Sequence, residues 1–423
     1  MISILICIVA FTGTFVLARR SLVWGMAACV GFGYAFGVLR ANILDTTSFL
    51  MWDASVLGLY ASYFTTRRTP EEIARTATLR LWVAVLILWP VVLTMVPVQY
   101  PLIQLVGLRG NTLLLPFLLI GASLQAEELD ELAMFLAAFN LMALGVGVTE
   151  YFIGIEAFFP RNAVTELMYN SQDVAGYTAF RIPAFFVNAH AYSGTMVITM
   201  PFLFGAWNRQ SRTWAGTLIW AGMAAAIIGV FLGASRTHTI VLFAVAIVSI
   251  FMFKLKTLAR AGLVFMLIFT AWVVSNNERL QRFVTLFDAE FVSTRILSSV
   301  DLPIVEAALE YPFGVGMGGG GTSIPYFLQD EILEPVAAEN EYIRIMLEEG
   351  VLGLGLWIAF IIWLLTRQSA MDLEVAPGRK LARFAALCYF ALACLGTGML
   401  TSVPYTALML SAAGWAAEGS NDV

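Results

Sequence analysis

The chain has 423 residues, of which 60% are hydrophobic and only 13% are charged, and its net charge is −5. This composition is far more apolar than that of a soluble domain and predicts an all-α polytopic membrane protein, with residues 1–423 forming a single membrane domain. The acidic balance argues against nucleic acid as a partner, because phosphate contacts require a basic face.

The apolar segments predict about 12 transmembrane helices, since a spanning helix needs about 20 mainly apolar residues. The first segment is expected to be a retained helix rather than a signal peptide, because Arg19 and Arg20 follow it without a cleavage site. A further segment, 404–417, is short, and the sequence leaves open whether it crosses. The predicted spans are 2–18, 21–39, 48–64, 81–98, 109–124, 131–149, 191–207, 213–233, 237–253, 261–275, 342–365 and 384–402.

Most of the 24 basic residues lie in loops on one side, which the positive-inside rule assigns to the cytoplasm. The basic residues on the opposite side are all arginines. Because Arg presents a planar, permanently charged fork that fits phosphate or carboxylate, this favours anion recognition at the outer face. The alternative is that few basic residues are tolerated on this side and that those present are arginines by chance. The outer set is Arg40, Arg109, Arg161, Arg181, Arg236, Arg279, Arg282, Arg295 and Arg344.

Two outer loops are long, at 150–190 and 276–341, and function is expected there. The first is rich in Phe and Tyr, which suits a segment at the membrane interface. The second is predicted to contain helices near 277–287 and 293–310, the latter ended by Pro312. The two halves of the chain show no internal repeat, which weakens a transporter interpretation.

A glycine-rich run, Gly314-Val-Gly-Met-Gly-Gly-Gly-Gly321, follows in the second loop. Residues without a Cβ reach left-handed backbone geometry, so such a run can present several N–H groups to an anion. It lacks the Lys-Ser/Thr ending of a nucleotide P-loop. A flexible hinge that closes over a substrate is the alternative.

The segment Ala338-Glu-Asn-Glu-Tyr-Ile-Arg344 is predicted to open the last long helix. Arg344 stands three residues after Glu341 and four before Glu348, so local ion pairs are available. Glu339 has no basic neighbour at helical spacing. A carboxylate at a partly desolvated rim can act as a general base, and the alternative role is favourable electrostatics at a helix start.

The remaining polar residues allow structural and functional interpretations. Arg236 stands between two spans, where it either snorkels to the interface or holds a lipid phosphate. His190 and His238 each head a span, which suggests capping, and without acidic partners they predict no metal site. Asp53 lies within a predicted span. It is expected to make a helix-pairing contact, and a proton relay is the alternative role. The four cysteines lie in apolar segments and predict neither disulfides nor a metal site.

Motifs in the order of the chain resemble the O-antigen ligase and polymerase superfamily, over roughly residues 180–365. The elements are Asn188-Ala-His-Ala, Gly233-Ala-Ser-Arg-Thr237, Arg295 followed by Tyr311-Pro-Phe-Gly-Val-Gly-Met-Gly318, Glu339-Asn-Glu-Tyr-Ile343 and Glu349-Gly-Val-Leu-Gly353.

The resemblance implies a metal-independent glycosyltransferase of the GT-C class in the bacterial inner membrane, with its active site facing the periplasm and no cofactor. The implied donor is a polyprenyl-diphosphate-linked glycan, and the acceptor is a glycan or glycolipid. Membrane lipid is a further partner, and a chain-length regulator is left open. Arg236 and Arg295 match positions that engage the donor diphosphate, and we expect substrate contacts also from Arg181, Asn340, Arg344, Gly316 and Gly318.

Glu339 departs from the family pattern, because ligases of the family usually carry His before this Asn, where it is proposed to activate the acceptor hydroxyl. A Glu at this position can still serve as the catalytic base. The change favours a polysaccharide polymerase over an O-antigen ligase, which remains an alternative. A flippase for the lipid-linked glycan is the alternative from another functional class.

Overall fold

The computed structural model describes residues 1–170, 180–210, 213–252, 264, 268, 272, 308–336, 340–367, 376–396 and 398–418. This part of the chain is helical and contains no β-strand. Its composition and helix lengths agree with a helical membrane protein, while the predicted number of 12 spans stays a prediction. Within these described ranges, six segments are long and apolar enough to cross a membrane: α1 (Ile2–Arg20), α2 (Leu22–Asn42), α6 and α7 together (Pro101–Ser123), α8 (Ala126–Ile153), α11 (Trp214–Leu232) and α16 (Glu341–Thr366).

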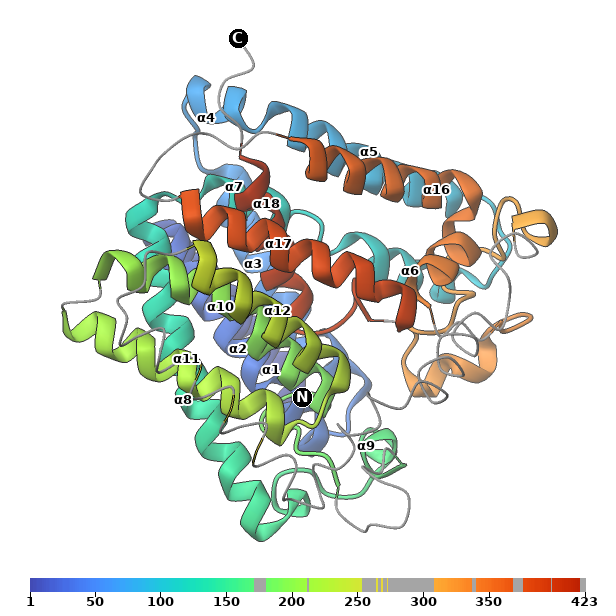
Figure 1. The fold of residues 1–423 in the computed structure, drawn as a ribbon. Helices are drawn as coiled ribbons and strands as arrows, with labels where there is room; N and C mark the ends of the chain where they lie inside the picture. The colour runs from blue at the N-terminus through green and yellow to red at the C-terminus, as the bar shows by residue number, and fades with distance from the viewer. Residues whose placement is uncertain are drawn as a thin grey trace.

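Other helices pack between and beside these six (Figure 1). The helix at the C-terminal end, α18, is buried along its whole length, so it belongs to the core whether or not it spans. The break between α6 (Pro101–Thr112) and α7 (Phe117–Ser123) divides the predicted 109–124 span. Further α-helices with described bounds are α3 (Met51–Thr65), α4 (Pro70–Arg75), α5 (Ala77–Leu93), α9 (Glu166–Asn170), α10 (Ala189–Gln210), α12 (Arg236–Met252), α17 (Ala376–Leu392) and α18 (Tyr405–Ala417).

The helix α10 lies at the centre, in contact with α8, α11, α12, α17 and α18. Its apolar side chains are buried almost throughout, and Phe202 stacks on Trp415 of α18 with ring centroids 5.5 Å apart. The helices α1 and α3 pack together, and α5 lies alongside α16 at the edge of the molecule (Figure 1). A helix that is apolar on all sides is expected in such a core.

Glycines bring α7 and α18 into direct backbone contact. A Cβ on Gly121 would come 2.0 Å from the Ser411 carbonyl oxygen, and one on Gly414 would come 1.9 Å from the Leu118 carbonyl oxygen. Small residues at helix crossings let backbones approach closely, which is a main source of helix association in membranes. The crossing therefore depends on both glycines.

The helix α16 is interrupted at Gly350, whose φ of 72° and ψ of −177° are not helical. In an unbroken helix the Val351 N–H would bond to the Leu347 carbonyl. Here the Val351 N–H donates to the Pro312 carbonyl at 3.0 Å, and the Leu347 carbonyl accepts from the Val315 N–H at 2.7 Å. The segment that begins the glycine run is thus inserted into the hydrogen bonding of α16.

Several basic side chains gather at the end of the bundle that the sequence assigns to the cytoplasm. The Glu418 carboxylate, just after α18, accepts from Arg75 at 2.9 Å and from Arg379 at 2.7 Å. Arg209 at the end of α10 pairs with Asp130 near the start of α8. These pairs join helix ends across the bundle, and the side of the membrane that they face stays a prediction.

The described part of the first predicted outer loop packs into the bundle. Phe186 is fully buried, with its ring 4.8 Å from that of Tyr34 and 5.4 Å from that of Tyr192. A Cβ on Gly37 would come 2.1 Å from the Phe186 carbonyl carbon, so α2 contacts the loop backbone. Of the second predicted loop, the helix near 277–287 and most of the one at 293–310 lie outside the described residues.

Replacement of Gly414 by Ala should destabilise the protein by about 1–3 kcal/mol, because the added methyl group forces α18 away from α7. Gly355→Ala in α16 is the matched control, since its Cβ meets no atom within 4 Å and Ala is the better helix former. Thermal unfolding of the detergent-solubilised proteins measures the stability of both variants. Equal melting temperatures for the two variants would contradict the close crossing.

Candidate functional site

A cavity of about 600 Å³ lies at the end of the bundle opposite the Glu418 cluster. The ends of α2, α3 and α10 and a face of α6 line it, together with four loop segments. The loops are 163–168, 181–188, 322–329 and 398–403, so the cavity joins parts of the chain that are far apart in sequence.

Three of the outer arginines, Arg40, Arg109 and Arg181, line this cavity. The Arg40 guanidinium carbon lies 3.7 Å from the centre of the Phe49 ring, which is the geometry of a cation–π contact. Arg181 donates from Nη2 to the Ala234 carbonyl at 3.2 Å. The grouping agrees with the anion recognition that the all-Arg outer face favours.

Arg109 is held by a carboxylate. Its Nη2 donates to Asp53 Oδ1 at 2.6 Å, and its Nε donates to Asp53 Oδ2. This bidentate pair links α6 to α3, so Asp53 makes the helix-pairing contact expected of it. Arg40, in contrast, has no carboxylate partner among the described residues. The cavity therefore retains a positive charge that an anion could neutralise.

The rest of the lining combines aromatic rings with neutral polar groups. Such a composition orients a polar ligand, because a few convergent donors and acceptors fix it against an apolar wall. The aromatic residues suit the apolar faces of sugar rings, and the hydroxyl and amide groups suit sugar hydroxyls. The aromatic members are Phe36, Phe49, Trp52 and Tyr326, and the neutral polar members include Asn188, Thr322, Ser323, Gln329, Thr401 and Ser402.

A buried carboxylate that the sequence analysis missed positions the 181–188 loop. Glu150, near the end of α8, accepts a hydrogen bond from the Ala184 N–H at 2.8 Å and is 1% exposed. Ala184 has a φ of 50°, a left-handed conformation that is unfavourable for Ala. The hydrogen bond offsets part of this strain, so Glu150 helps to place Arg181. No local spacing in the sequence indicates this contact.

The two histidines lie side by side next to the cavity. His190 lines it, and its ring centroid is 4.3 Å from that of His238. His238 is buried, and its Nδ1 is 2.8 Å from Ser235 Oγ. The described residues contain no group of three His, Cys, Asp or Glu side chains that could hold a metal ion.

Arg344 lies in a buried ion cluster, apart from the residues that line the cavity. It donates to Glu341 at 2.7 Å and to Glu348 at 2.8 Å, and all three side chains are fully buried. This confirms the local pairs predicted from their spacing. Asn111 of α6 also accepts from Arg344, at 3.0 Å.

Asn340 is the N-cap of α16. Its Oδ1 accepts from the Tyr342 N–H at 2.8 Å, and its Nδ2 donates to the Cys394 carbonyl at 2.8 Å. The predicted start of the last long helix is therefore confirmed. Substrate contacts from Asn340 and Arg344 stay predictions.

The glycine run is buried against α6 and α16. Gly316 and Gly318 have φ angles of 92° and 85°, the left-handed geometry expected of them. A Cβ on Gly318 would come 2.7 Å from the Ile103 carbonyl oxygen, and one on Gly320 would come 2.9 Å from Glu348 Oε1. The run thus packs tightly beside the cavity, and the residues that follow it, from Thr322 onward, line the cavity.

Three further predicted site residues do not line the cavity or are not described. Arg236 is the first residue of α12 and is partly buried. It lies two residues after Ala234, whose carbonyl accepts a hydrogen bond from Arg181. Arg236 itself does not line the cavity. Arg295 and Glu339 lie outside the described residues. Their roles stay predictions.

Neither the comparison with family models nor that with curated proteins finds a match for this chain. The assignment of a function therefore depends on the geometry of the cavity and on the motifs themselves.

Arg344→Met should destabilise the protein by about 3–5 kcal/mol, because Glu341 and Glu348 would be buried without their cation. Arg40→Met, at the edge of the cavity, should change the free energy of unfolding by at most about 1 kcal/mol, the value of one cation–π contact. The stability of both variants is measured by thermal unfolding and by the amount of protein in the membrane. Wild-type stability of Arg344→Met would contradict a structural role for the cluster.

Arg40→Ala and Arg181→Ala should each weaken binding of a soluble prenyl diphosphate, such as farnesyl diphosphate, by about tenfold, since each removes a charge-assisted hydrogen-bond donor. The Lys variants should retain part of the affinity, because Lys keeps the charge but loses the fork. Isothermal titration calorimetry measures the dissociation constants. Unchanged affinity in both Ala variants would exclude the cavity as the anion site.

Proposed function

We propose that this chain is a membrane glycosyltransferase that polymerises polyprenyl-diphosphate-linked oligosaccharide repeat units at the periplasmic face of the bacterial inner membrane. The products would be O-antigen, capsule or exopolysaccharide. The observation that carries the proposal is the cavity that Arg40, Arg109 and Arg181 share with aromatic and hydroxyl side chains. The arginines of such a lining suit a diphosphate, and its aromatic and hydroxyl groups suit sugars.

The positions of the resembling motifs support the proposal. Asn188 and His190 of the first motif line the cavity, and Arg181 bonds to the Gly233–Thr237 motif through the Ala234 carbonyl. Two later motifs, Tyr311–Gly318 and Glu349–Gly353, contact each other at the interruption of α16, where the Val351 N–H donates to the Pro312 carbonyl at 3.0 Å. The first motif thus lines the cavity, the second contacts an arginine that lines it, and two later motifs contact each other.

The proposed reaction is a single displacement at the anomeric carbon of the donor. The acceptor hydroxyl oxygen forms the new bond to that carbon, the bond from the carbon to the diphosphate oxygen breaks, and Glu339 takes the hydroxyl proton. Arg40 and Arg181, with Arg295 by resemblance, stabilise the diphosphate that leaves. Fixed donors aimed at a developing negative charge supply on the order of a few kcal/mol each.

Two other functions remain as alternatives. An O-antigen ligase would transfer the finished glycan to lipid A-core with the same donor chemistry. A transporter for the lipid-linked glycan is favoured by one observation, the interruption of α16 at Gly350 beside buried charges. Interrupted helices of this kind form the binding sites of many secondary transporters.

A strain that lacks this chain should lose long polymer while a single repeat unit is still exported or attached to lipid A-core. Complementation with Glu339→Gln or Arg181→Ala should fail to restore the polymer, because the base or a diphosphate contact is missing. Glycolipid gels and analysis of released polymer measure chain length. Complementation with Gly355→Ala serves as the control, since it alters an open position in α16.

The same gels separate the alternatives. Full-length polymer that accumulates on the polyprenyl carrier would identify a ligase. Repeat units that remain single and inaccessible from the periplasmic side would identify a transporter. Either result would overturn the polymerase proposal.

A further inference from the structure

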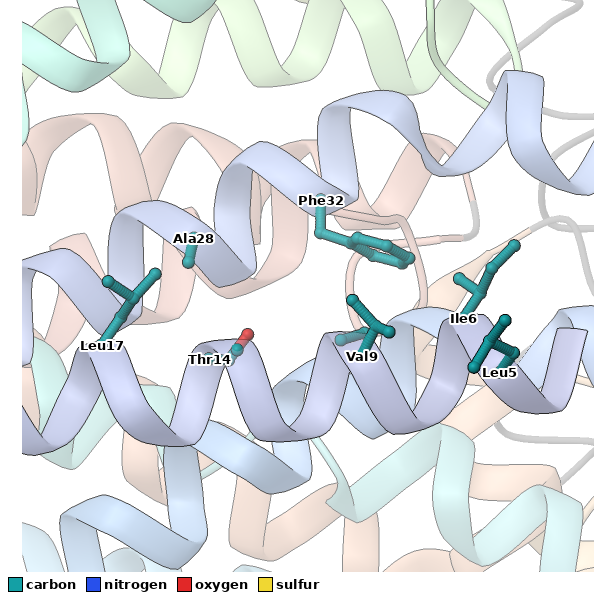
Figure 2. Close-up of a pocket in the computed structure, with 9 residues that line it drawn as sticks. Leu5, Ile6, Val9, Thr14, Leu17, Ala28 and Phe32 are labelled. Carbon is teal, nitrogen blue, oxygen red and sulfur yellow. The ribbon is translucent and has the colours of Figure 1, made fainter.

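A second, separate pocket lies between α1 and α2. It is an apolar groove of about 340 Å³. Figure 2 shows Val9 of α1 and Phe32 of α2 pointing into the space between the two helices. The helices touch where a Cβ on Gly25 would come 2.2 Å from that of Ala18. The lining residues are Leu5, Ile6, Val9, Ala10, Gly13, Thr14, Leu17, Ala28 and Phe32.

The groove is suited to hydrocarbon and unsuited to water or sugar. Its only polar side chain is that of Thr14, and the Thr14 hydroxyl is already hydrogen-bonded to Ser55 at 2.7 Å. A bound water needs two or more polar partners, which this lining does not offer. The helix α1 is also the least buried of the six candidate spans, with 22% of its apolar window covered. The groove therefore opens where membrane lipid is the surrounding solvent.

Its length matches one leaflet of a bilayer. The lining of α1 runs from Leu5 to Leu17, which at 1.5 Å per residue is about 18 Å. Half of the hydrocarbon core of a bilayer is about 15 Å thick. One acyl chain that lies along α1 would fill this distance.

The charges at the two ends give the groove a direction. Arg20 follows Gly13 by seven residues, so it lies on the same face of α1, and it is exposed. At the other end, the Asp45 carboxylate accepts from Ser3 at 2.6 Å and lies 3.8 Å from the amino group of Met1. The hydrogen bond from Ser3 lowers the pKa of the Asp45 carboxyl, so that end carries a negative group. The Met1 amino group at that end is therefore paired with a carboxylate, whereas the exposed Arg20 side chain can attract a phosphate at the other end.

We propose that this groove holds one acyl chain of an anionic membrane phospholipid, whose phosphate lies at Arg20. The proposed headgroup position differs from that of the donor, because the Arg40 and Arg181 cavity lies at the opposite end of the helices from Arg20. The site is a structural lipid site and is independent of the proposed glycosyltransferase activity.

Photocrosslinking tests this site in the full-length protein. The purified chain is placed in phosphatidylcholine nanodiscs with a trace of phosphatidylglycerol that carries a diazirine in its acyl chain. After irradiation, mass spectrometry maps the crosslinks. We expect them to concentrate on residues 5–17 and 28–32, with a lower yield on the exposed face of α8, which serves as the reference for bulk lipid.

Gly13→Leu should lower the crosslink yield in the groove about tenfold, which corresponds to the exclusion of about two buried methylene groups. Gly145→Leu, on the exposed face of α8, is the matched control and should leave the yield unchanged. At both positions a Cβ meets no atom within 4 Å, so both variants should fold. Gly13→Ala should give an intermediate loss, and thermal unfolding verifies that the proteins are intact.

Arg20→Ala should lower the preference for phosphatidylglycerol over a phosphatidylcholine probe about fivefold, as expected for the loss of one basic residue near the phosphate. Three results would overturn the proposal: an even crosslink yield over α1 and α8, equal yields in the two Leu variants, or an unchanged lipid preference in Arg20→Ala. Crosslinks that join two copies of the chain through α1 would instead identify a helix interface and would also overturn it.

Discussion

The ion cluster around Arg344 holds together the elements that form one wall of the cavity. Arg344 of α16 reaches both Glu348 in its own helix and Asn111 of α6. Glu341 accepts from Arg344 through one oxygen and from the Gly398 N–H, at 2.7 Å, through the other. Gly398 and the neighbouring face of α6 line the cavity, and Gly320 packs on Glu348. One buried arginine thus fixes the relative positions of two helices, a loop and the glycine run.

Arg344 and Arg40 differ in how their charges are compensated. A charged side chain within a bilayer is costly unless it is paired, and a pair is stable only if its remaining donors and acceptors are satisfied. Inside the protein, Arg344 is surrounded by two carboxylates and Asn111, which together accept hydrogen bonds from its guanidinium group. Among the described residues, Arg40 contacts the Phe49 ring and lines the cavity without a carboxylate partner. The first arrangement suits a structural role, and the second leaves donors available to an anion.

The sequence predicts local features well and long-range ones poorly. Composition and long apolar segments predicted the helical class, and local spacing predicted the start of α16 and the ion pairs of Arg344, which depend on residues within four positions. The contact of Arg344 with Asn111 joins residues 233 positions apart, and no pattern indicates it. Arg40 and Arg109 were recognised only as members of an all-Arg outer face. Their place in one cavity follows from the packing of α2 against α3 and from the Asp53–Arg109 pair that joins α3 to α6, neither of which composition encodes.

The interruption of α16 can be interpreted from the partners of its backbone. A transporter leaves the groups freed at a helix break to bind an ion or a substrate. Here the two groups that an unbroken helix would join, the Leu347 carbonyl and the Val351 N–H, bond to Val315 and Pro312. The break is therefore filled by the start of the glycine run, which leads directly into the cavity wall at Thr322. Non-helical backbone within a membrane is tolerated where protein satisfies it. This arrangement anchors the glycine run and the following cavity wall to α16, and it leaves neither of these two backbone groups available to an ion or a substrate.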